Sequence, residues 1–329
     1  MSVAALEYSQ GVVLALVVTS FALPLVWYVL RRRQLLDQPN ERSSHEAPTP
    51  RGAGVALLMG VVAGTSFAGL PLGALFGVVS FGLLGAVDDL RPRSAKLRVA
   101  VQAALALVVA WLLWREISPA AAAWFGVLGA AAMPIVVNTV NFMDGINGIT
   151  AVHGVVFGTV YAVLLGSTLG WEWGVMGAAL VGSSLAFFPW NFRKRALVFL
   201  GDSGSYMVGA TVALLLIATT GFGLGAIVAL APLVIYLTDV LFTLVVRLTQ
   251  GQHLMTAHRQ HVYQRLVQQG WGHRSVTLFV GSLSLVAGVV AIATAQQVTP
   301  AWTSVGLLAC LAVFYLLSPR LLERGRFHG

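Results

Sequence analysis

Charged side chains are scarce in this chain. Lys, Arg, Asp and Glu make up only 10% of its 329 residues, whereas 57% are hydrophobic and the mean hydropathy is +0.83. This composition leaves too little polar surface for a soluble globule and excludes that class of protein. A single cysteine excludes an internal disulfide and a thiolate metal cluster. The first ten residues carry no basic side chain, and no small-residue cleavage pattern follows, so we expect the first apolar stretch to remain as a membrane span.

Long apolar runs are what the chain has in abundance. Each run is long enough to cross the roughly 30 Å hydrocarbon layer as a helix, and none shows the alternation of a barrel strand. The sequence therefore predicts an all-α integral membrane protein, a polytopic bundle of about eleven transmembrane helices in one domain over residues 1–329. The runs lie near 11–30, 52–69, 71–87, 97–114, 122–142, 148–166, 171–189, 204–220, 224–246, 276–295 and 299–317.

Basic residues are distributed unevenly between the connections. Of the twenty Lys and Arg residues, all but Arg115 lie in alternate connections or in the C-terminal tail. Because basic residues stay on the cytoplasmic side during insertion, we expect cytoplasmic loops near 31–51, 88–98, 143–148, 190–203 and 247–275. Most of the net charge of +8 is thus a topology signal, with a further role in binding phosphates or anionic headgroups. We expect no nucleic-acid partner, because no soluble module presents this charge.

Two adjacent acids, Asp88 and Asp89, end the third run, and Lys96 follows them. Neighbouring carboxylates repel each other unless a divalent cation or basic groups neutralise them, and all-oxygen ligation suits Mg²⁺. The alternative is that one acid caps the next helix while the arginines after it anchor that helix at the interface.

Asn138, Asn141 and Asp144 recur every three residues before Gly145 and Gly148 break the helix. Amides and a carboxylate on one helix face are costly in lipid, which favours a polar cavity or a bound nucleotide over a simple polar turn.

Three further features carry polar groups into the same set of loops. Asp202 and Ser203 precede the eighth run, where they suit either a metal–phosphate site or an ordinary helix cap. Asp239 lies inside the ninth run and is interpreted as a structural polar partner. The segment His258–Arg259–Gln260–His261 is typical of a phosphate-binding site.

These motifs, taken in order, resemble the polyprenyl-phosphate N-acetylhexosamine-1-phosphate transferases, and the resemblance covers nearly the whole chain. It rests on the first-loop stretch 42–54, Asp88–Asp89 with Lys96, the segment 141–148, the segment 201–205, and His258 to His261. The resemblance implies transfer of a sugar 1-phosphate from a UDP-N-acetylhexosamine to undecaprenyl phosphate, with release of UMP and with Mg²⁺ or Mn²⁺ as cofactor. It also implies a bacterial inner-membrane location, and family analogy suggests a homodimer.

The same resemblance implies roles for individual residues. Asp202 and Asp88 would ligate the metal, and Asp88 or Asp89 would activate the lipid phosphate or attack first as a nucleophile, so one-step and two-step routes both stay open. Asp144 and His261 complete the catalytic candidates. The candidates for substrate binding are His45, Arg51, Lys96, Asn138, Asn141, Asn147, His258 and Arg259.

Departures from the family pattern favour a subfamily. Many members have an acid where this chain has Asn147, which cannot be a charged ligand. The His-Arg-Gln-His form and the Arg-Ser-Ser-His loop look more like the O-antigen initiators, whose donors include UDP-GlcNAc and deoxy derivatives, than like the peptidoglycan translocase. A membrane transporter for a lipid or anion is the main alternative, although the acids crowd one rim and transport sites lie near the midplane. A non-catalytic binding subunit is a third reading.

Overall fold

Every apolar run falls on a helix in the computed structural model, which describes residues 3–39, 47–116, 119–253 and 259–325. Two short antiparallel strands, β1 (Leu36–Asp37) and β2 (Thr49–Pro50), follow the first helix. The helices are α1 (Val3–Arg32), α2 (Gly54–Thr65), α3 (Leu72–Leu90), α4 (Ala95–Glu116), α5 (Pro119–Met143), α6 (Ile149–Leu165), α7 (Trp171–Asn191), α8 (Gly201–Gly221), α9 (Ala226–Leu230), η1 (Ala231–Leu233), α10 (Val234–Thr249), α11 (Val262–Gln268), α12 (His273–Ala295) and α13 (Ala301–Gly325). The predicted all-α polytopic membrane fold is confirmed.

The count of eleven spans is not confirmed. Within the described ranges, eight helical segments are long and apolar enough to cross a membrane, one of them formed by α9, η1 and α10 together. Three other apolar segments have 17 residues or fewer, 54–65, 129–143 and 149–165, and the second of them is the C-terminal part of the 25-residue α5. At 1.5 Å per residue, the 12-residue α2 extends only about 18 Å, well below a bilayer core. Hydropathy detects such a helix but does not show that it spans.

Helix α8 is the centre of the bundle. Its residues from Gly201 to Thr219 are buried, and it packs against α3 and α5 along much of its length. Small residues permit this close approach: a Cβ added at Gly209 would lie 2.6 Å from the Cα of Val137 on α5. The start of α8 is therefore fixed rigidly between the ends of α3 and α5.

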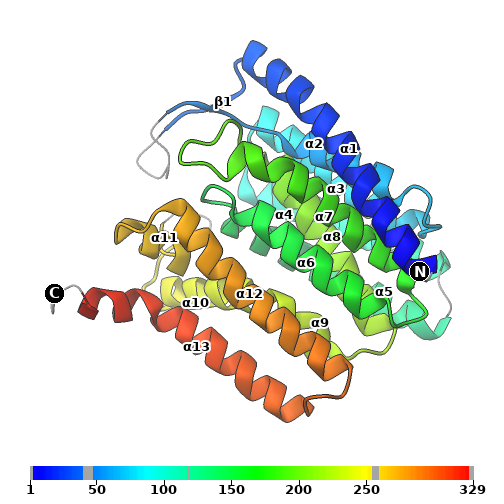
Figure 1. The fold of residues 1–329 in the computed structure, drawn as a ribbon. Helices are drawn as coiled ribbons and strands as arrows, with labels where there is room; N and C mark the ends of the chain where they lie inside the picture. Colours follow the sequence, from blue (N-terminus) through cyan, green and yellow to red (C-terminus); the bar gives the residue numbers. More distant parts are fainter. Residues whose placement is uncertain (1–2, 40–46, 117–118, 254–258, 326–329) are drawn as a thin grey trace.

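One end of the bundle gathers the β1–β2 hairpin, α11 and the connection between α7 and α8 (Figure 1). The N-terminus lies at the opposite end in the same view. Among the described residues, Arg51, Asp89 and Asp202 lie together at this end, so the fold brings together residues more than 150 positions apart.

Candidate active site

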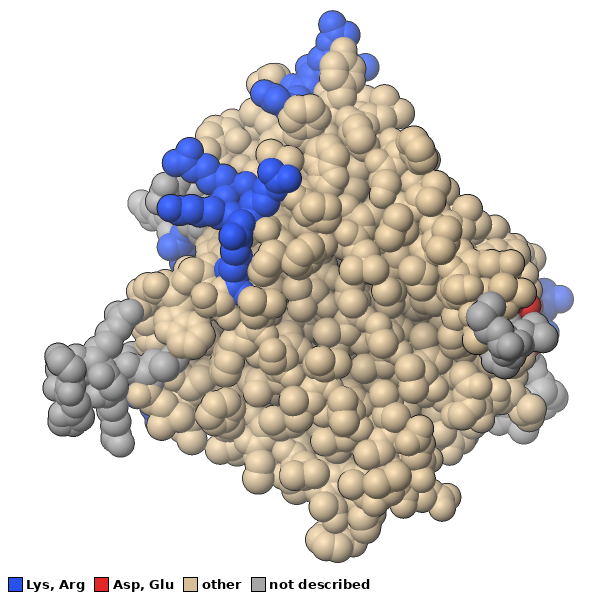
Figure 2. Space-filling model, viewed as in Figure 1, with Lys and Arg blue, Asp and Glu red and all other residues tan. Residues whose placement is uncertain are grey.

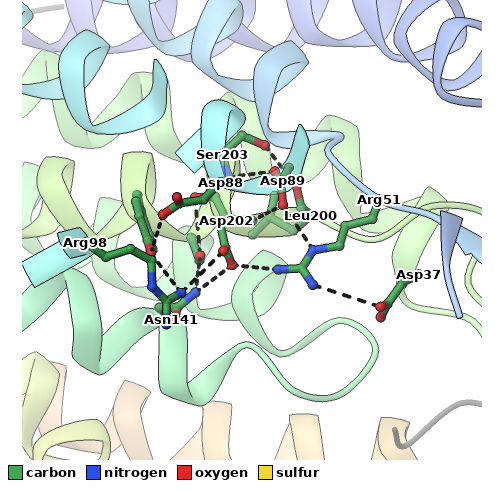
Figure 3. A network of polar contacts seen from close by, with 11 residues as sticks. Asp37, Arg51, Asp88, Asp89, Arg98, Asn141, Leu200, Asp202 and Ser203 are labelled. Atoms are coloured by element: carbon green, nitrogen blue, oxygen red, sulfur yellow. Dashed lines mark hydrogen bonds and ion pairs between the residues drawn. The ribbon is translucent and has the colours of Figure 1, made fainter. Parts of the chain in front are cut away.

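The acids at the end of α3 and the start of α8 form one polar network with Arg51 (Figure 3). Asp89 accepts three charge-assisted or backbone hydrogen bonds, from Arg51 Nε at 3.0 Å and from the amides of Asp202 at 2.8 Å and Ser203 at 2.9 Å. A carboxylate at a helix N-terminus satisfies amides that have no partner within the helix and complements the helix dipole. Asp89 thus caps α8, a helix that starts 112 positions later in the chain, and not the helix that follows it.

Asp88 has quite different surroundings. The residue is 2% exposed, and its Oδ2 accepts one long hydrogen bond of 3.3 Å from the hydroxyl of Tyr206. Its Oδ1 is buried and has no hydrogen-bond partner within the described part of the chain. Buried polar atoms without a partner are uncommon and costly, and they often mark functional positions. Asp88 is therefore the acid with a free oxygen, whereas Asp89 has none to spare.

Asp202 contacts the cationic side chains of the network. Its carboxylate accepts from Arg51 Nη2 at 2.7 Å and from Asn141 Nδ2 at 3.1 Å, and Arg98 Nη1 lies 3.7 Å away. The helix begins at Gly201, so Asp202 lies in its first turn and does not cap it. Of the two alternatives drawn from the sequence, the ordinary helix cap is wrong, because Asp89 supplies the cap and leaves the Asp202 side chain directed at cations.

Two glycines make this contact between α3 and α8 sterically feasible. A Cβ at Gly85, one turn before the acid pair, would lie 2.1 Å from the carbonyl oxygen of Asp202. Gly201 has φ of +77°, and a Cβ there would lie 2.5 Å from Asp89 Oδ2. A left-handed conformation favours glycine, and here the space for a side chain is taken by the capping carboxylate.

Arg51 is held at the centre of the network by backbone contacts. It follows β2, and the amides of its neighbours Gly52 and Ala53 both donate to the carbonyl of Phe199. Its guanidinium also lies 4.0 Å from Asp37. Desolvation lowers the pKa of Arg51, but Asp202, Asp89 and Asp37 outweigh it and raise the pKa above its ordinary value. The first loop thus delivers a permanent positive charge to the acids.

Asp144 lies just after α5, which ends at Met143 as the glycines predicted. Its Oδ1 accepts from Thr150 at 2.5 Å. Although part of the side chain remains accessible, the surrounding protein desolvates it and raises the pKa of Asp144 to about 6. Thr150 and Arg51 act in the opposite direction, and the charges of Asp202 and Asp89 add to the rise. Asp144 is thus electrostatically coupled to the network without a direct hydrogen bond to its acids.

The other asparagines of this region have structural partners. Asn141 joins the network, donating to Asp202 and to Ser205 Oγ at 2.9 Å. Asn138 instead donates to Gln102 of α4 at 2.5 Å, so the expected single polar face is divided between two sets of partners. Asn147 donates to the carbonyl of Arg193 at 2.9 Å and ties the turn to the α7–α8 connection.

The histidine segment docks on the same turn through α11. His261 Nδ1 lies 2.9 Å from Asp239 Oδ1, and the hydroxyl of Tyr263 donates to the carbonyl of Phe142 at 3.0 Å. Asp239 also accepts from the amide of Val262 and from the hydroxyl of Tyr315. Asp239 is therefore the structural partner that the sequence indicated, and it orients His261. Burial and the nearby charges of Asp239 and Asp144 raise the pKa of Tyr263 well above its ordinary value, so its hydroxyl stays a donor.

Lys96 is a predicted substrate-binding residue that the described contacts do not bring into the network. Lys96 is exposed at the start of α4 and makes no hydrogen bond or ion pair with any described residue. Arg259 lies before α11, where its carbonyl accepts from Gln268 at 3.0 Å. His45 and His258 lie outside the described residues.

Two residues that the sequence reasoning did not select do join it. Arg98 contacts Asp202 and lies 3.4 Å from the hydroxyl of Tyr206, which in turn contacts Asp88. Tyr206 follows Asp202 by four residues and so shares its helix face, a signal that the sequence contained.

The oxygen ligands available at this site suit a hard divalent cation only in part. Among residues whose placement is described, no group of three or more His, Cys, Asp or Glu side chains could hold a metal ion. Mg²⁺, however, is commonly bound through one or two carboxylates and completed by substrate phosphates and water. The buried free oxygen of Asp88 and the carboxylate of Asp202 fit that pattern. The two acids are linked through Tyr206, which contacts Asp88, and Arg98, which contacts both Tyr206 and Asp202.

Comparison with known proteins matches this part of the molecule. The model of glycosyl transferase family 4 matches residues 71–220, a stretch that runs from α3 to α8 and holds Asp88, Asp89, Asn141, Asp144 and Asp202. Over these residues the chain is similar to glycosyl transferase family 4. Arg51 and His261 lie outside the stretch that the family model matches.

Individual bacterial proteins are similar to most of the chain. A decaprenyl-phosphate N-acetylglucosaminephosphotransferase of Mycobacterium leprae is 29% identical over 333 residues, covering 86% of this chain and 82% of its own. The protein of that name from Mycobacterium tuberculosis H37Rv is 28% identical, covering 91% and 85%. An undecaprenyl-phosphate alpha-N-acetylglucosaminyl 1-phosphate transferase of Escherichia coli K12 is 26% identical, covering 88% and 84%. These bacterial relatives and the long apolar helices make the chain a bacterial membrane protein.

Proposed function

We propose that this protein transfers N-acetylhexosamine 1-phosphate, with N-acetylglucosamine as the first candidate sugar, from a UDP-sugar to undecaprenyl phosphate. The names of the family relatives support the sugar and the polyprenyl phosphate acceptor. The observation that carries the proposal is the buried oxygen of Asp88, which has no described hydrogen-bond partner and is close to Asp202 and Arg98, while Arg51 pairs with the same Asp202. It combines a free carboxylate oxygen with two permanent cations, as a reaction between two phosphates requires.

The reaction joins two anions. An oxygen of the lipid phosphate bonds to the β-phosphorus of the UDP-sugar, and the bond from that phosphorus to the bridging oxygen breaks. The bridging oxygen leaves with its electron pair on UMP, and the product is a lipid-linked diphosphate sugar. Arg51 and Arg98 lie where they can offset the charge of the approaching phosphates, because both guanidinium groups are about one-third exposed at the network.

Asp88 is the residue we assign to the lipid phosphate. Its free oxygen can accept the proton of a monoanionic phosphate, whereas both oxygens of Asp89 are occupied by Arg51 and by the amides at the start of α8. Asp89 is then a positioning residue that fixes the start of α8 and, through it, Asp202. A two-step route with a covalent phosphoryl group on a carboxylate would use the same oxygen of Asp88.

We also propose Mg²⁺, or Mn²⁺, held by Asp202 and Asp88 with phosphate oxygens of the donor. When bound, such a cation neutralises phosphate charge and polarises the phosphorus that is attacked. Asp144, His261 and Arg259 are assigned to the donor side, because α11 rests on the turn that holds Asp144. Roles for Lys96, His45 and His258 stay predictions.

The cytoplasmic orientation of this end of the bundle, the bacterial inner membrane as location, and initiation of O-antigen or another envelope polysaccharide belong to the same proposal. The excess of Lys and Arg in the loops at this end supports the orientation.

The experiment is a donor panel. Purified protein receives undecaprenyl phosphate, Mg²⁺ and one of several UDP-N-acetylhexosamines, and UMP release is measured. We expect release with at least one donor, and its loss in Asp88→Asn and Asp202→Asn but not in the control Glu172→Gln, an acid in the first turn of α7 at the far end of that helix. No UMP from any donor would refute the transferase. Full activity in both site variants would refute the assignment of the site.

A further inference from the structure

A second group of cations lies apart from the acid network. Four basic side chains, Arg193, Lys194, Arg195 and Arg274, line a cavity of about 550 Å³ between the α7–α8 connection and the start of α12. The volume lies within the range of about 300–1,000 Å³ that is usual for small-molecule sites. All four residues are exposed. Figure 2 shows a cluster of Lys and Arg on this side, next to a broad face without charge.

No described carboxylate neutralises this group. None of the four side chains forms an ion pair with any acid whose placement is described. Arg193 Nε donates to the carbonyl of Pro189 at 2.6 Å, and the guanidinium of Arg274 lies 5.7 Å from the ring centre of Phe192. These contacts fix two of the cations against the protein. Like charges held together around one cavity attract an anion strongly.

The cavity is held in place by the turn beside the active site and is still separate from it. Asn147 donates to the carbonyl of Arg193, and the Gly148 amide donates to Asn191 Oδ1. None of the four basic residues contacts Asp88, Asp89 or Asp202 among the hydrogen bonds and ion pairs of the described chain. Hydrogen bonds therefore fix the loop backbone, while the charges of the four basic side chains are available to a ligand.

Aromatic residues place the cavity at the depth of lipid headgroups. Trp27 donates through its indole nitrogen to the carbonyl of Leu197 in the same connection, and its ring packs edge-on against Trp190 at 6.2 Å. Trp271 precedes Arg274 by three residues. All three tryptophans are half-buried, as is typical of the belts that tryptophan forms at the membrane–water interface. The cavity thus lies where a charged end of the bundle meets its apolar side.

We propose that this basic cavity binds the phosphate of an anionic phospholipid headgroup in the leaflet next to the active site. The site is distinct from the one assigned to the two reacting phosphates. A bound lipid would neutralise the cations of the α7–α8 connection and hold that connection, and with it the start of α8, at the membrane surface.

The test compares lipid binding in two matched variants. Purified protein in neutral detergent is titrated with phosphatidylglycerol or phosphatidylcholine of identical acyl chains, and bound lipid is counted by native mass spectrometry. The site variant is Lys194→Gln with Arg195→Gln, and the control is Arg31→Gln with Arg32→Gln, which removes the same charge at the end of α1. Because each basic residue near a surface strengthens anionic lipid binding roughly five-fold, we expect phosphatidylglycerol affinity to fall roughly 30-fold in the site variant. We expect less than about a three-fold change in the control, since Arg31 and Arg32 are not among the residues that line the cavity and exposed charges are mostly screened.

Three outcomes would overturn the proposal. Equal losses in both variants would mean general attraction to positive charge. Displacement of the lipid by equimolar inorganic phosphate would mean a site for free anions. A raised KM for the UDP-sugar with unchanged lipid binding would place the cavity in the donor site. Melting temperatures of both variants verify folding, and Arg274→Gln provides a second site variant.

Discussion

Replacing Asp88 and Asp89 separately by asparagine should distinguish a catalytic acid from a structural one, a difference that the sequence does not show. Asp89→Asn removes a charge that accepts from two backbone amides and from Arg51. A hydrogen bond to a charged group contributes about 1.5–3 kcal/mol, and removing one partner of a buried pair costs about 3–5 kcal/mol. Arg51 is partly exposed and the asparagine keeps one acceptor oxygen, so we expect a loss of about 2–4 kcal/mol.

Asp88→Asn should behave in the opposite way. Its Oδ1 has no partner to lose, and its Oδ2 has a single bond of 3.3 Å. Neutralising a buried charge that lacks partners is close to neutral or stabilising, so we expect a change within about 1 kcal/mol. Activity should nevertheless vanish in Asp88→Asn, because the free oxygen is what the lipid phosphate needs.

Thermal unfolding in detergent and UMP release measure the two effects together. At about 2–4 °C per kcal/mol, Asp89→Asn should lower the melting temperature by roughly 4–16 °C, and Asp88→Asn by less than about 4 °C. The reasoning would be refuted by the reverse order, with Asp88→Asn the more destabilised protein, since that would place the cap of α8 on the wrong acid.

Three further expectations concern the surroundings of the network. The pKa of Asp144 is raised to about 6, so a reaction that needs its carboxylate should slow about tenfold per pH unit below pH 6. Thr150→Val removes a hydrogen bond that favours the charged carboxylate and should move this acidic limb of the kcat/KM profile to higher pH. An unchanged limb would exclude Asp144 as its origin. Gly85→Ala should lower the melting temperature and UMP release together, because its Cβ would lie 2.1 Å from the carbonyl oxygen of Asp202; normal values for both would contradict the tight packing of α3 on α8. Asp239→Asn should release His261 and the start of α11 and cost about 2–4 kcal/mol in thermal unfolding, with Tyr315→Phe giving a smaller loss of the same kind; equal stability to wild type would remove Asp239 as the anchor.

Local patterns in the sequence predicted the helices and most members of the site, and the exceptions have physical reasons. Hydropathy located the long helices, because an apolar run of that length has no other stable form in lipid, but it did not predict the short α11. The count of eleven spans is not confirmed, because α2 is apolar and yet extends only about 18 Å. The break between α5 and α6 was predicted from Gly145 and Gly148, because the conformational freedom of glycine is a local property.

The sequence did not predict which side chains pair across helices. Nothing near Asp89 indicates that its partners are the amides of Asp202 and Ser203, since that contact depends on how α3 packs against α8. Asn138 and Asn141 show the same limit: one turn apart on α5, they meet Gln102 and Asp202 respectively. Lys96 was chosen for its spacing from the acids, and Arg98, two residues later, is the side chain that the helix directs toward them.

The cap of α8 also has a consequence for the order of steps in membrane insertion, because its carboxylate is synthesised before the amides that it caps. Asp89 finds its two amides 113 and 114 residues further along the chain, so a nascent polypeptide that has inserted only its first seven helices carries an acid pair with no partner. Until Gly201 to Ser203 arrive, only arginine side chains, Arg51 at Asp89 and Arg98 and Arg93 near Asp88, can offset that charge. Insertion of the eighth helix is thus the event that closes the site, and a ribosome stalled before it should leave a fragment prone to degradation.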